Sequence, residues 1–494
     1  MYLGIDLGTS SVKVILMDDK QSVIAFTFAK LTCAHPFPLW SEQNPQDWWN
    51  ATCLAISQLQ QTHSHQLANL KAIGLSGQQH GATLLDKSDR VLRPAILWDD
   101  GRAFEQCQQL ESIVPQYGEI TGNRVMPGFT APKLRWIQQN EPTVFDQIHK
   151  ILLPKDYLRL RLTGDYASDL SDSAGTSWLN VGKRIWSDEM LAATGLTQKQ
   201  MPALFEGSDI TGHVTPHLAK QWGIPRNTPV VGGAGDNAAS AISVNVIKPG
   251  NAFLSLGTSG VYFVANETYA PNPIGGVHTF CHCLPNLWHQ MSVHLSASSC
   301  LTWLSELLSV NPDVLLHETE ATSPNENQLL FLPYLSGERT PHNDPYARGV
   351  FFGMTHTTQR TDLVRAVLEG VAFAFADGQA AMLNANPRID EISVLGGGAR
   401  NFYWGKILAS VLQRPLTYRQ ERAGGAAMGA ARLAWLGINP NDIANIASVF
   451  TAPPIEKIIW PDEQLVTLYL EKRKLFQQLY QQLKPLFLGC RALT

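Results

Sequence analysis

An internal near-repeat limits the folds open to this chain. Residues 3–14 and 252–263 each form a run of strand-favouring residues that is broken by Leu-Gly-Thr-Ser and then resumes. Each run predicts a hairpin whose turn carries glycine, threonine and serine. Because the same unit opens both halves of the chain, we predict two homologous domains rather than an array of short repeats.

Chain length supports this division. At 494 residues the chain exceeds the roughly 250–300 residues at which a single hydrophobic core stops growing. Strand and helix signals alternate along it, which favours an α/β fold. The pattern is interrupted near residues 243–250, so we place the domains at residues 1–245 and 246–494. A stripe of apolar residues between Pro461 and Lys484 predicts a terminal helix on the second domain, with binding to a partner as the alternative.

Charge and cysteine content exclude several classes of function. The formal net charge is −4, so no basic field is available to hold a nucleic-acid backbone. Seven cysteines without framework spacing indicate reduced thiols and a cytoplasmic protein. The first residues show no targeting signal, and no run approaches the roughly 20 apolar residues of a membrane span. We therefore expect neither nucleic acid nor membrane as a partner.

The first near-repeat has the features of a phosphate site. Asp6 ends a predicted strand, and Gly8, Thr9 and Ser10 form the turn that follows. Such a turn brings backbone N–H groups and two hydroxyls close to an anion. Asp6 can hold hydrated Mg²⁺, which prefers carboxylates, water and substrate phosphates. An ordinary hairpin turn is the alternative, but the second copy at residues 257–260 favours two hairpins that clamp a triphosphate.

A glycine triplet at residues 396–398 lies between a predicted strand and a predicted helix. Glycines at this place would let the flat group of a nucleoside lie against the backbone, with Asn401 as a polar contact. A tight turn between the strand and the helix is the alternative.

Asp236 and Asn237 stand at a glycine-lined junction of strand and helix. The glycines there mimic a dinucleotide-binding fingerprint, but Asp236 would point a negative charge at the pyrophosphate. Its carboxylate is better suited to accept a proton from a hydroxyl, as phosphoryl transfer to an alcohol requires. A helix N-cap is the alternative role, and the local sequence alone slightly favours it. Gln79 and His80, flanked by glycines, offer donors and acceptors to a polyol, with a satisfied turn histidine as the alternative.

Together these motifs resemble the sugar-kinase family named for its Phe-Gly-Gly-Tyr signature, which includes glycerol kinase, gluconokinase and the pentulose kinases. The matching stretches, in family order, are residues 4–10, 39–43, 77–81, 96–102, 235–237, 255–260, 334–341 and 396–399. Further stretches resemble the branch of the family that phosphorylates D-xylulose, namely residues 38–49, 126–133, 153–157 and 171–176.

The resemblance implies an actin-like (ribonuclease H-like) ATPase fold, with the catalytic cleft between a sugar-binding first domain and a nucleotide-binding second domain. It implies ATP-dependent phosphorylation of D-xylulose to D-xylulose 5-phosphate in xylose catabolism, with Mg²⁺, and it suggests a homodimer. The residue roles that it implies are Asp236 as general base and Asp6 as metal-linked aspartate, Gln79, His80, Asp236 and Asn237 for the sugar, and Thr9, Ser10, Gly257, Thr258, Gly397, Gly398 and Asn401 for ATP.

Two other functions stay open at this point. One is a kinase of the same family that acts on another ketose or a polyol, because Gln79 stands where bacterial relatives often have methionine. The other is a non-enzymatic actin-like protein in which nucleotide drives a conformational switch. The presence of both His80 and Asp236 favours a kinase, because a switch protein has no need of a polyol site.

Overall fold

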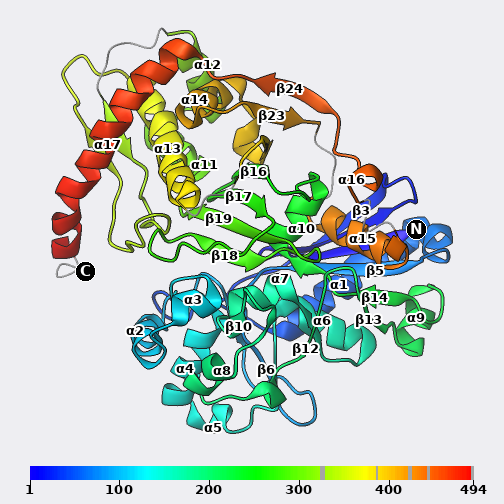
Figure 1. Cartoon of the computed structure of the whole chain (residues 1–494). Helices are drawn as coiled ribbons and strands as arrows, with labels where there is room; N and C mark the ends of the chain where they lie inside the picture. Colours follow the sequence, from blue (N-terminus) through cyan, green and yellow to red (C-terminus); the bar gives the residue numbers. More distant parts are fainter. Residues whose placement is uncertain (323–328, 385–387, 421–424, 442–445, 491–494) are drawn as a thin grey trace.

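The computed structural model describes residues 1–322, 329–384, 388–420, 425–441 and 446–490. It has two lobes, each built on a seven-stranded sheet (Figure 1). The first sheet contains β1 (Tyr2–Leu7), β2 (Ser11–Met17), β3 (Val23–Lys30), β5 (Ala72–Gly77), β13 (Ile210–His213), β14 (Pro229–Val231) and β15 (Ala234–Gly235). The second contains β16 (Asn251–Leu256), β17 (Gly260–Asn266), β18 (His278–Cys281), β19 (Trp288–His294), β22 (Glu391–Leu395), β23 (Leu416–Arg419) and β24 (Ile455–Ile459).

The same strand order recurs in both sheets. The order β3-β2-β1-β5-β14 in the first sheet corresponds to β19-β17-β16-β22-β23 in the second. In each sheet, the first three strands of this order are antiparallel to one another in sequence, and the last two run parallel to the third. Both predicted hairpins are confirmed, with Leu7 opposite Val12 and Leu256 opposite Gly260. The chain therefore has two homologous α/β halves with the sheet plan of the actin-like fold.

Helices cover the faces of both sheets. Those between the first sheet's strands and up to the second sheet are α1 (Pro45–Leu67), α2 (Phe104–Ile113), α3 (Tyr117–Thr121), α4 (Thr130–Asn140), α5 (Pro142–Phe145), α6 (Pro154–Thr163), α7 (Leu170–Ser173), α8 (Asp188–Ala193), α9 (Pro216–Trp222) and α10 (Asp236–Ser243). The later helices are α11 (Ser298–Leu308), α12 (Pro312–Glu320), α13 (Arg360–Leu383), α14 (Phe402–Leu412), α15 (Gly425–Gly437), α16 (Ile446–Val449) and α17 (Glu463–Cys490). Short strands outside the two sheets are β4 (Glu42–Gln43), β6 (Thr83–Leu85), β7 (Ala95–Ile96), β8 (Lys150–Leu152), β9 (Ala167–Asp169), β10 (Leu179–Asn180), β11 (Ile185–Trp186), β12 (Ala203–Phe205), β20 (Leu330–Leu332) and β21 (Val350–Phe352).

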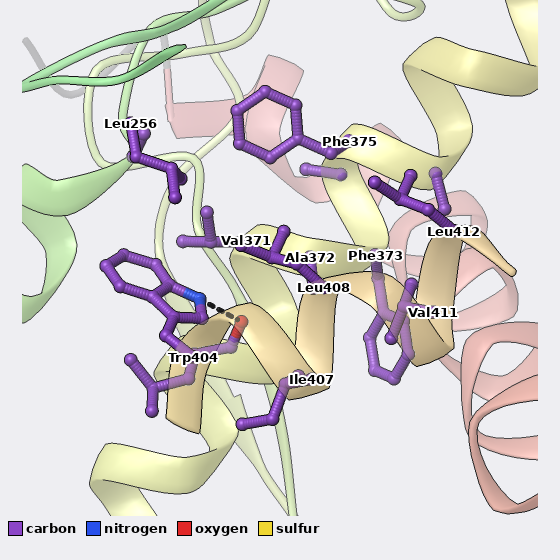
Figure 2. Packing of buried hydrophobic residues seen from close by; sticks show 14 of the residues in the cluster. Leu256, Val371, Ala372, Phe373, Phe375, Trp404, Ile407, Leu408, Val411 and Leu412 are labelled. Carbon is purple, nitrogen blue, oxygen red and sulfur yellow. Dashed lines mark hydrogen bonds between the residues drawn. The ribbon is translucent and has the colours of Figure 1, made fainter. Parts of the chain in front are cut away.

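The core of the second lobe is built around α13. Trp404 of α14 is 1% exposed and donates its indole N–H to the carbonyl oxygen of Leu368 at 3.1 Å (Figure 2). Val371, Phe373 and Phe375 of α13 pack in the same cluster. Each large apolar side chain buried in this way stabilises the fold by about 1.5–3 kcal/mol.

Helix α13 is also long and apolar enough to cross a membrane by length and composition. From the sequence we expected no such stretch. However, 83% of its apolar window is buried inside the protein. A core helix must be apolar on most of its surface, so packing accounts for the composition of α13.

The predicted terminal helix is confirmed as α17, which runs along the outer side of the second lobe (Figure 1). It packs against that lobe through the buried side chains of Tyr469, Phe476 and Tyr480. Two residues of the predicted stripe, Leu468 and Leu475, remain 37% and 44% exposed. The apolar face of the helix is thus only partly used for this contact.

One helix from the late part of the chain packs on the first sheet. Helix α15 lies against β1 and β5, and a methyl carbon built on Gly4 would stand 1.9 Å from the carbonyl oxygen of Ala427. The same holds for Gly74 and the carbonyl oxygen of Ala430, also at 1.9 Å. Only glycine allows a helix backbone to approach a strand so closely. A single core cluster therefore contains residues of both sheets, α10 and α15.

Candidate active site

Asp6 and Asp236 lie at the same edge of the first sheet. Strands β1 and β15 both run parallel to β5, and their register aligns Asp6, Ser76 and Ala234. Asp236 begins α10 directly after β15. In sheets with parallel strands, ligands bind in the crevice outside the carboxyl ends of the strands. Both aspartates stand at such a crevice.

Asp236 is the first residue of α10, and the N-cap position is occupied by Gly235 without a side-chain capping bond. The alternative role of Asp236 as a helix N-cap is therefore wrong. Its Oδ1 accepts hydrogen bonds from the backbone N–H of Asn237 at 2.7 Å and from the Nδ2 of the same residue at 3.0 Å. Burial, and then the nearby charge of Asp6, raise the pKa of Asp236 to about 7. A carboxylate with a pKa near neutrality is well matched to general-base catalysis.

Asp6 is 8% exposed and accepts a hydrogen bond from the Oγ of Ser76 at 2.7 Å. Burial raises the pKa of its carboxyl group, and the bond from Ser76 opposes that shift. Two carboxylates that influence each other in one crevice repel one another, and a divalent cation would offset this repulsion. Carboxylate oxygens are ligands that Mg²⁺ prefers, so the residues present fit a magnesium ion held by Asp6.

The two predicted phosphate turns differ in what their side chains already bind. The Oγ1 of Thr9 donates to Oε1 of Gln78 at 3.0 Å and accepts from the indole N–H of Trp98 at 3.0 Å. Ser10 and Thr258 are exposed, and within the described ranges their hydroxyl groups make no hydrogen bond. The hydroxyl groups of Ser10 and Thr258 are therefore free to bind an anion, whereas that of Thr9 is held in the turn by its neighbours.

The glycine triplet lies beside the second phosphate turn. A methyl carbon built on Gly396 would stand 2.7 Å from the carbonyl oxygen of Leu256, the last residue of β16. Gly397 is exposed, and nothing lies within 4 Å of the place where its side chain would be. Asn401 caps α14 by accepting from the backbone N–H of Trp404 at 2.9 Å. The backbone of the triplet is thus open next to Gly257. The side-chain oxygen of Asn401, in contrast, is used to cap α14.

Gln79 and His80 follow β5, the strand between those that lead to Asp6 and Asp236. A methyl carbon built on Gly235 would stand 2.7 Å from Nε2 of Gln79, so this amide lies directly beside the start of α10. His80 has a φ of 67°, which is uncommon outside glycine. Lys133 Nζ and Thr130 Oγ1 hold this conformation by donating to the carbonyl oxygen of His80 at 2.9 and 3.2 Å.

Three residues at this site were not predicted from the sequence. The ring of Phe129 stacks on the His80 ring with centroids 4.7 Å apart, and His278 of the second lobe lies 5.6 Å from Phe129. Arg339, also of the second lobe, lies 5.9 Å from the centre of the Trp98 ring. Phe129 and Arg339 belong to stretches that are typical of the family and His278 does not, and no local pattern shows that the three residues meet.

Arg102 ends the family-like stretch at residues 96–102, and its side chain is already paired within the first lobe. It is bound by Asp100 and Glu42, each at 2.7 Å, and its guanidinium lies 3.5 Å from the centre of the Trp40 ring. A guanidinium paired with two carboxylates and stacked on a ring has few donors left for a ligand. It stabilises the segment that carries Trp98.

Comparison with known proteins agrees with these features. The model described as the FGGY family of carbohydrate kinases, N-terminal domain, matches residues 1–243, and the C-terminal domain model of that family matches residues 252–438. The chain is 52% identical over 487 residues to a xylulose kinase from Escherichia coli (strain K12), covering 98% of this chain and 100% of the relative. It is 50% identical to a xylulose kinase from Klebsiella pneumoniae over the same shares of both chains.

Solved structures give the same result. The crystal structure of a xyloylose kinase from Brucella ovis superposes with a TM-score of 0.95 at 48% identity, covering 98% of this chain and 99% of that chain. The crystal structure of xylulose kinase from Rhodospirillum rubrum superposes with a TM-score of 0.89 at 30% identity, with the same shares covered.

Proposed function

The chain belongs to the FGGY family of carbohydrate kinases, and from this premise we propose that it transfers the γ-phosphoryl group of ATP to the 5-hydroxyl of D-xylulose. The product is D-xylulose 5-phosphate. The observation that carries the proposal is the placement of Asp236 at the same sheet edge as Asp6, beside Gln79 and His80. The xylulose kinases to which the chain is about 50% identical support D-xylulose as the acceptor.

Asp236 acts as the general base in this proposal. A sugar hydroxyl is a weak nucleophile, and its proton must leave as the bond to phosphorus forms. The carboxylate of Asp236 accepts that proton, and Asn237 holds it by two hydrogen bonds to one oxygen. Gln79 and His80 bind hydroxyl groups of the sugar and keep the 5-hydroxyl within reach of the base.

The turns and the glycine triplet hold the nucleotide. Ser10 and Thr258 donate to phosphate oxygens, and the backbones of Gly257, Gly397 and Gly398 leave room for the nucleoside and phosphates. Asp6 would hold Mg²⁺ through water, and the ion would supply positive charge at the transferring phosphoryl group. Thr9 keeps the first turn in shape through Gln78 and Trp98. The nitrogen of Asn401 faces the adenosine while its oxygen caps α14.

We place the sugar-binding domain at residues 1–245 and the nucleotide-binding domain at residues 246–494, with closure of the cleft excluding water from the reaction. We also propose that the enzyme is a cytoplasmic homodimer without nucleic acid or membrane partners. Light scattering of the purified chain tests the dimer. The alternative of a non-enzymatic switch is not supported, because carbohydrate-kinase family models match both halves of the chain.

One substrate screen tests the proposed function. ADP formation is measured with D-xylulose, L-ribulose, other ketoses and glycerol under the same conditions. We expect D-xylulose to give the highest kcat/KM. A higher kcat/KM for glycerol or L-ribulose would leave the family assignment intact and overturn the choice of D-xylulose.

A further inference from the structure

Arg339 carries its guanidinium from the second lobe into the space between the lobes. It lines a cavity of about 590 Å³ that is also bounded by Trp98 and Gly128 of the first lobe. The guanidinium lies 5.9 Å from the centre of the Trp98 ring. A methyl carbon built on Gly128 would stand 3.7 Å from Nη2 of Arg339. A cation of the second lobe therefore lies beside Trp98 and Gly128 of the first lobe.

This guanidinium has free donors. Among the described residues, no carboxylate lies within 4.0 Å of the side-chain nitrogens of Arg339, and no group accepts a hydrogen bond from them. The neighbouring Glu338 is already bound by the backbone N–H groups of Leu295 and Arg339 and by the ring of His294. Removal of a cation from water costs free energy unless acceptors replace the lost hydration. A ligand in the cavity would supply them.

A series of contacts leads from Asp236 to Arg339. Gln79 lies against Gly235 at the start of α10, and His80 is the next residue along the chain. The ring of Phe129 then stacks on that of His80, with centroids 4.7 Å apart, and Gly128, the residue before Phe129, is the one beside Nη2 of Arg339. The groups thus follow one another in the order Asp236, Gln79, His80, Arg339.

The order of these groups can be compared with the order of the polar groups along the acceptor sugar. The furanose ring of D-xylulose closes by addition of the 5-hydroxyl to the C2 carbonyl, so a sugar with a free 5-hydroxyl is in its open-chain form. When the 5-hydroxyl is at Asp236, the C2 carbonyl lies toward the opposite end of the chain. A carbonyl oxygen accepts hydrogen bonds and donates none, and guanidinium donates and accepts none.

We propose that Arg339 is a specificity-determining residue that donates hydrogen bonds from the second lobe to the C2 carbonyl oxygen of an open-chain ketose. This inference rests on the proposed function. A polyol carries a hydroxyl at the same carbon. Its oxygen can also accept a hydrogen bond, but its proton needs an acceptor that Arg339 does not offer, whereas both lone pairs of a carbonyl oxygen are open to the guanidinium. The residue therefore favours ketoses over the corresponding polyols and makes a ligand contact that joins the two lobes.

The test uses 5-deoxy-D-xylulose, which keeps the carbonyl and lacks the reacting hydroxyl, and the alcohol obtained by its reduction at C2. Isothermal titration of the full chain gives Kd for both. We expect the wild-type enzyme to prefer the ketose, and Arg339→Met to weaken ketose binding by about 10–100-fold. The alcohol should change by less than about threefold, so that the preference disappears. Phosphorylation of D-xylulose by the same wild-type preparation is the reference.

Three further variants make the result decisive. Arg339→Lys keeps the positive charge but lacks the paired N–H donors of a guanidinium, so it should lose an intermediate amount of ketose binding. This variant also serves as the test if Arg339→Met does not fold. Arg124→Met removes another arginine that lines the same cavity and should leave the ketose preference intact. Asp99→Asn removes the charge of a carboxylate that lines the same cavity and should do the same.

Retention of the ketose preference by Arg339→Met or, if that variant is unfolded, by Arg339→Lys would overturn the inference. An equal loss in Asp99→Asn would also overturn it, because Arg339 would then act through an ion pair between the lobes. If the wild-type enzyme phosphorylates D-xylulose but the variants contradict the role of Arg339, the proposed function stands and only this inference is wrong. A wild-type enzyme that neither phosphorylates D-xylulose nor binds the probe rejects both.

Discussion

The Nδ1 of His80 lies 2.7 Å from the carbonyl oxygen of Gly175. A carbonyl can only accept, so Nδ1 carries the proton of the neutral ring and Nε2 is left as an acceptor. Burial holds the pKa of His80 well below 6.5, so the ring stays neutral at physiological pH. The Nε2 of His80 is thereby held in a fixed orientation as a hydrogen-bond acceptor, which the proposed contact with a sugar hydroxyl requires.

The first prediction concerns this acceptor. His80→Asn keeps an amide donor for Gly175, and asparagine tolerates a positive φ, but the acceptor at the Nε2 position is lost. We expect KM for D-xylulose to rise by about 3–10-fold, with little change in Tm. Steady-state kinetics and a melting curve on one preparation measure both, and His80→Ala serves as the control that should also lower Tm. An unchanged KM would show that His80 only shapes the turn.

The second prediction concerns the base. Asp236→Asn keeps the shape of the side chain and removes the proton acceptor, so kcat should fall by about 10²–10⁴-fold. KM for the sugar should change much less, because Gln79 and His80 remain. Turnover under saturating substrates measures the effect. Near-normal turnover in a folded Asp236→Asn enzyme would reject Asp236 as the general base.

The third prediction concerns stability and pH in the absence of metal. The pKa of Asp236 is about 7 in the folded chain, against an ordinary value of 3.8. Between these values the folded chain binds a proton that the unfolded chain does not, so this group lowers the free energy of unfolding as pH rises toward 7. Asp236→Asn removes the buried charge, and we expect Tm at pH 8 to increase by about 2–4 °C. The gain should vanish near pH 4, and a gain that is independent of pH would contradict this account of the buried carboxylate.

The fourth prediction concerns Asp6. A carboxylate that holds Mg²⁺ through water lies in its outer shell, and loss of such a partner costs about 10–100-fold in metal affinity. We expect Asp6→Ala to raise the Mg²⁺ concentration needed for half-maximal activity by that factor. Sugar binding, measured by titration without nucleotide, should be nearly unchanged. An unaltered dependence on Mg²⁺ and ATP would leave Asp6 with a structural role only.

Local signals in the sequence account for the parts that were predicted correctly. Both hairpins follow from Gly-Thr-Ser turns between alternating strands, and the strand-to-helix junction before Asp236 follows from its glycines. The exact place of Asp236 in its helix did not follow, because a first helical residue and an N-cap have the same local composition. Thr9 was expected to bind phosphate with its hydroxyl, but that group is held by Gln78 and Trp98, which lie far away in the chain.

The contacts of second-lobe residues with the first lobe could not be predicted from local sequence patterns. Arg339 meets Trp98 and Gly128 only because the two sheets pack around one shared core. No periodicity within residues 334–341 indicates that contact. In the same way, the approach of α15 to Gly4 depends on how the whole chain is arranged, because a glycine within a strand can equally mark a bulge or a tight bend.

The contact between α15 and Gly4 has a consequence for how the protein is made. A ribosome completes β1 and β5 early, yet the helix that covers them emerges only with residues 425–437. Domains usually fold in order as they are synthesised, but in this nascent chain the first sheet must wait, with an apolar face uncovered, until residue 437 has been added. We expect truncated chains that end before α15 to aggregate or to be held by chaperones.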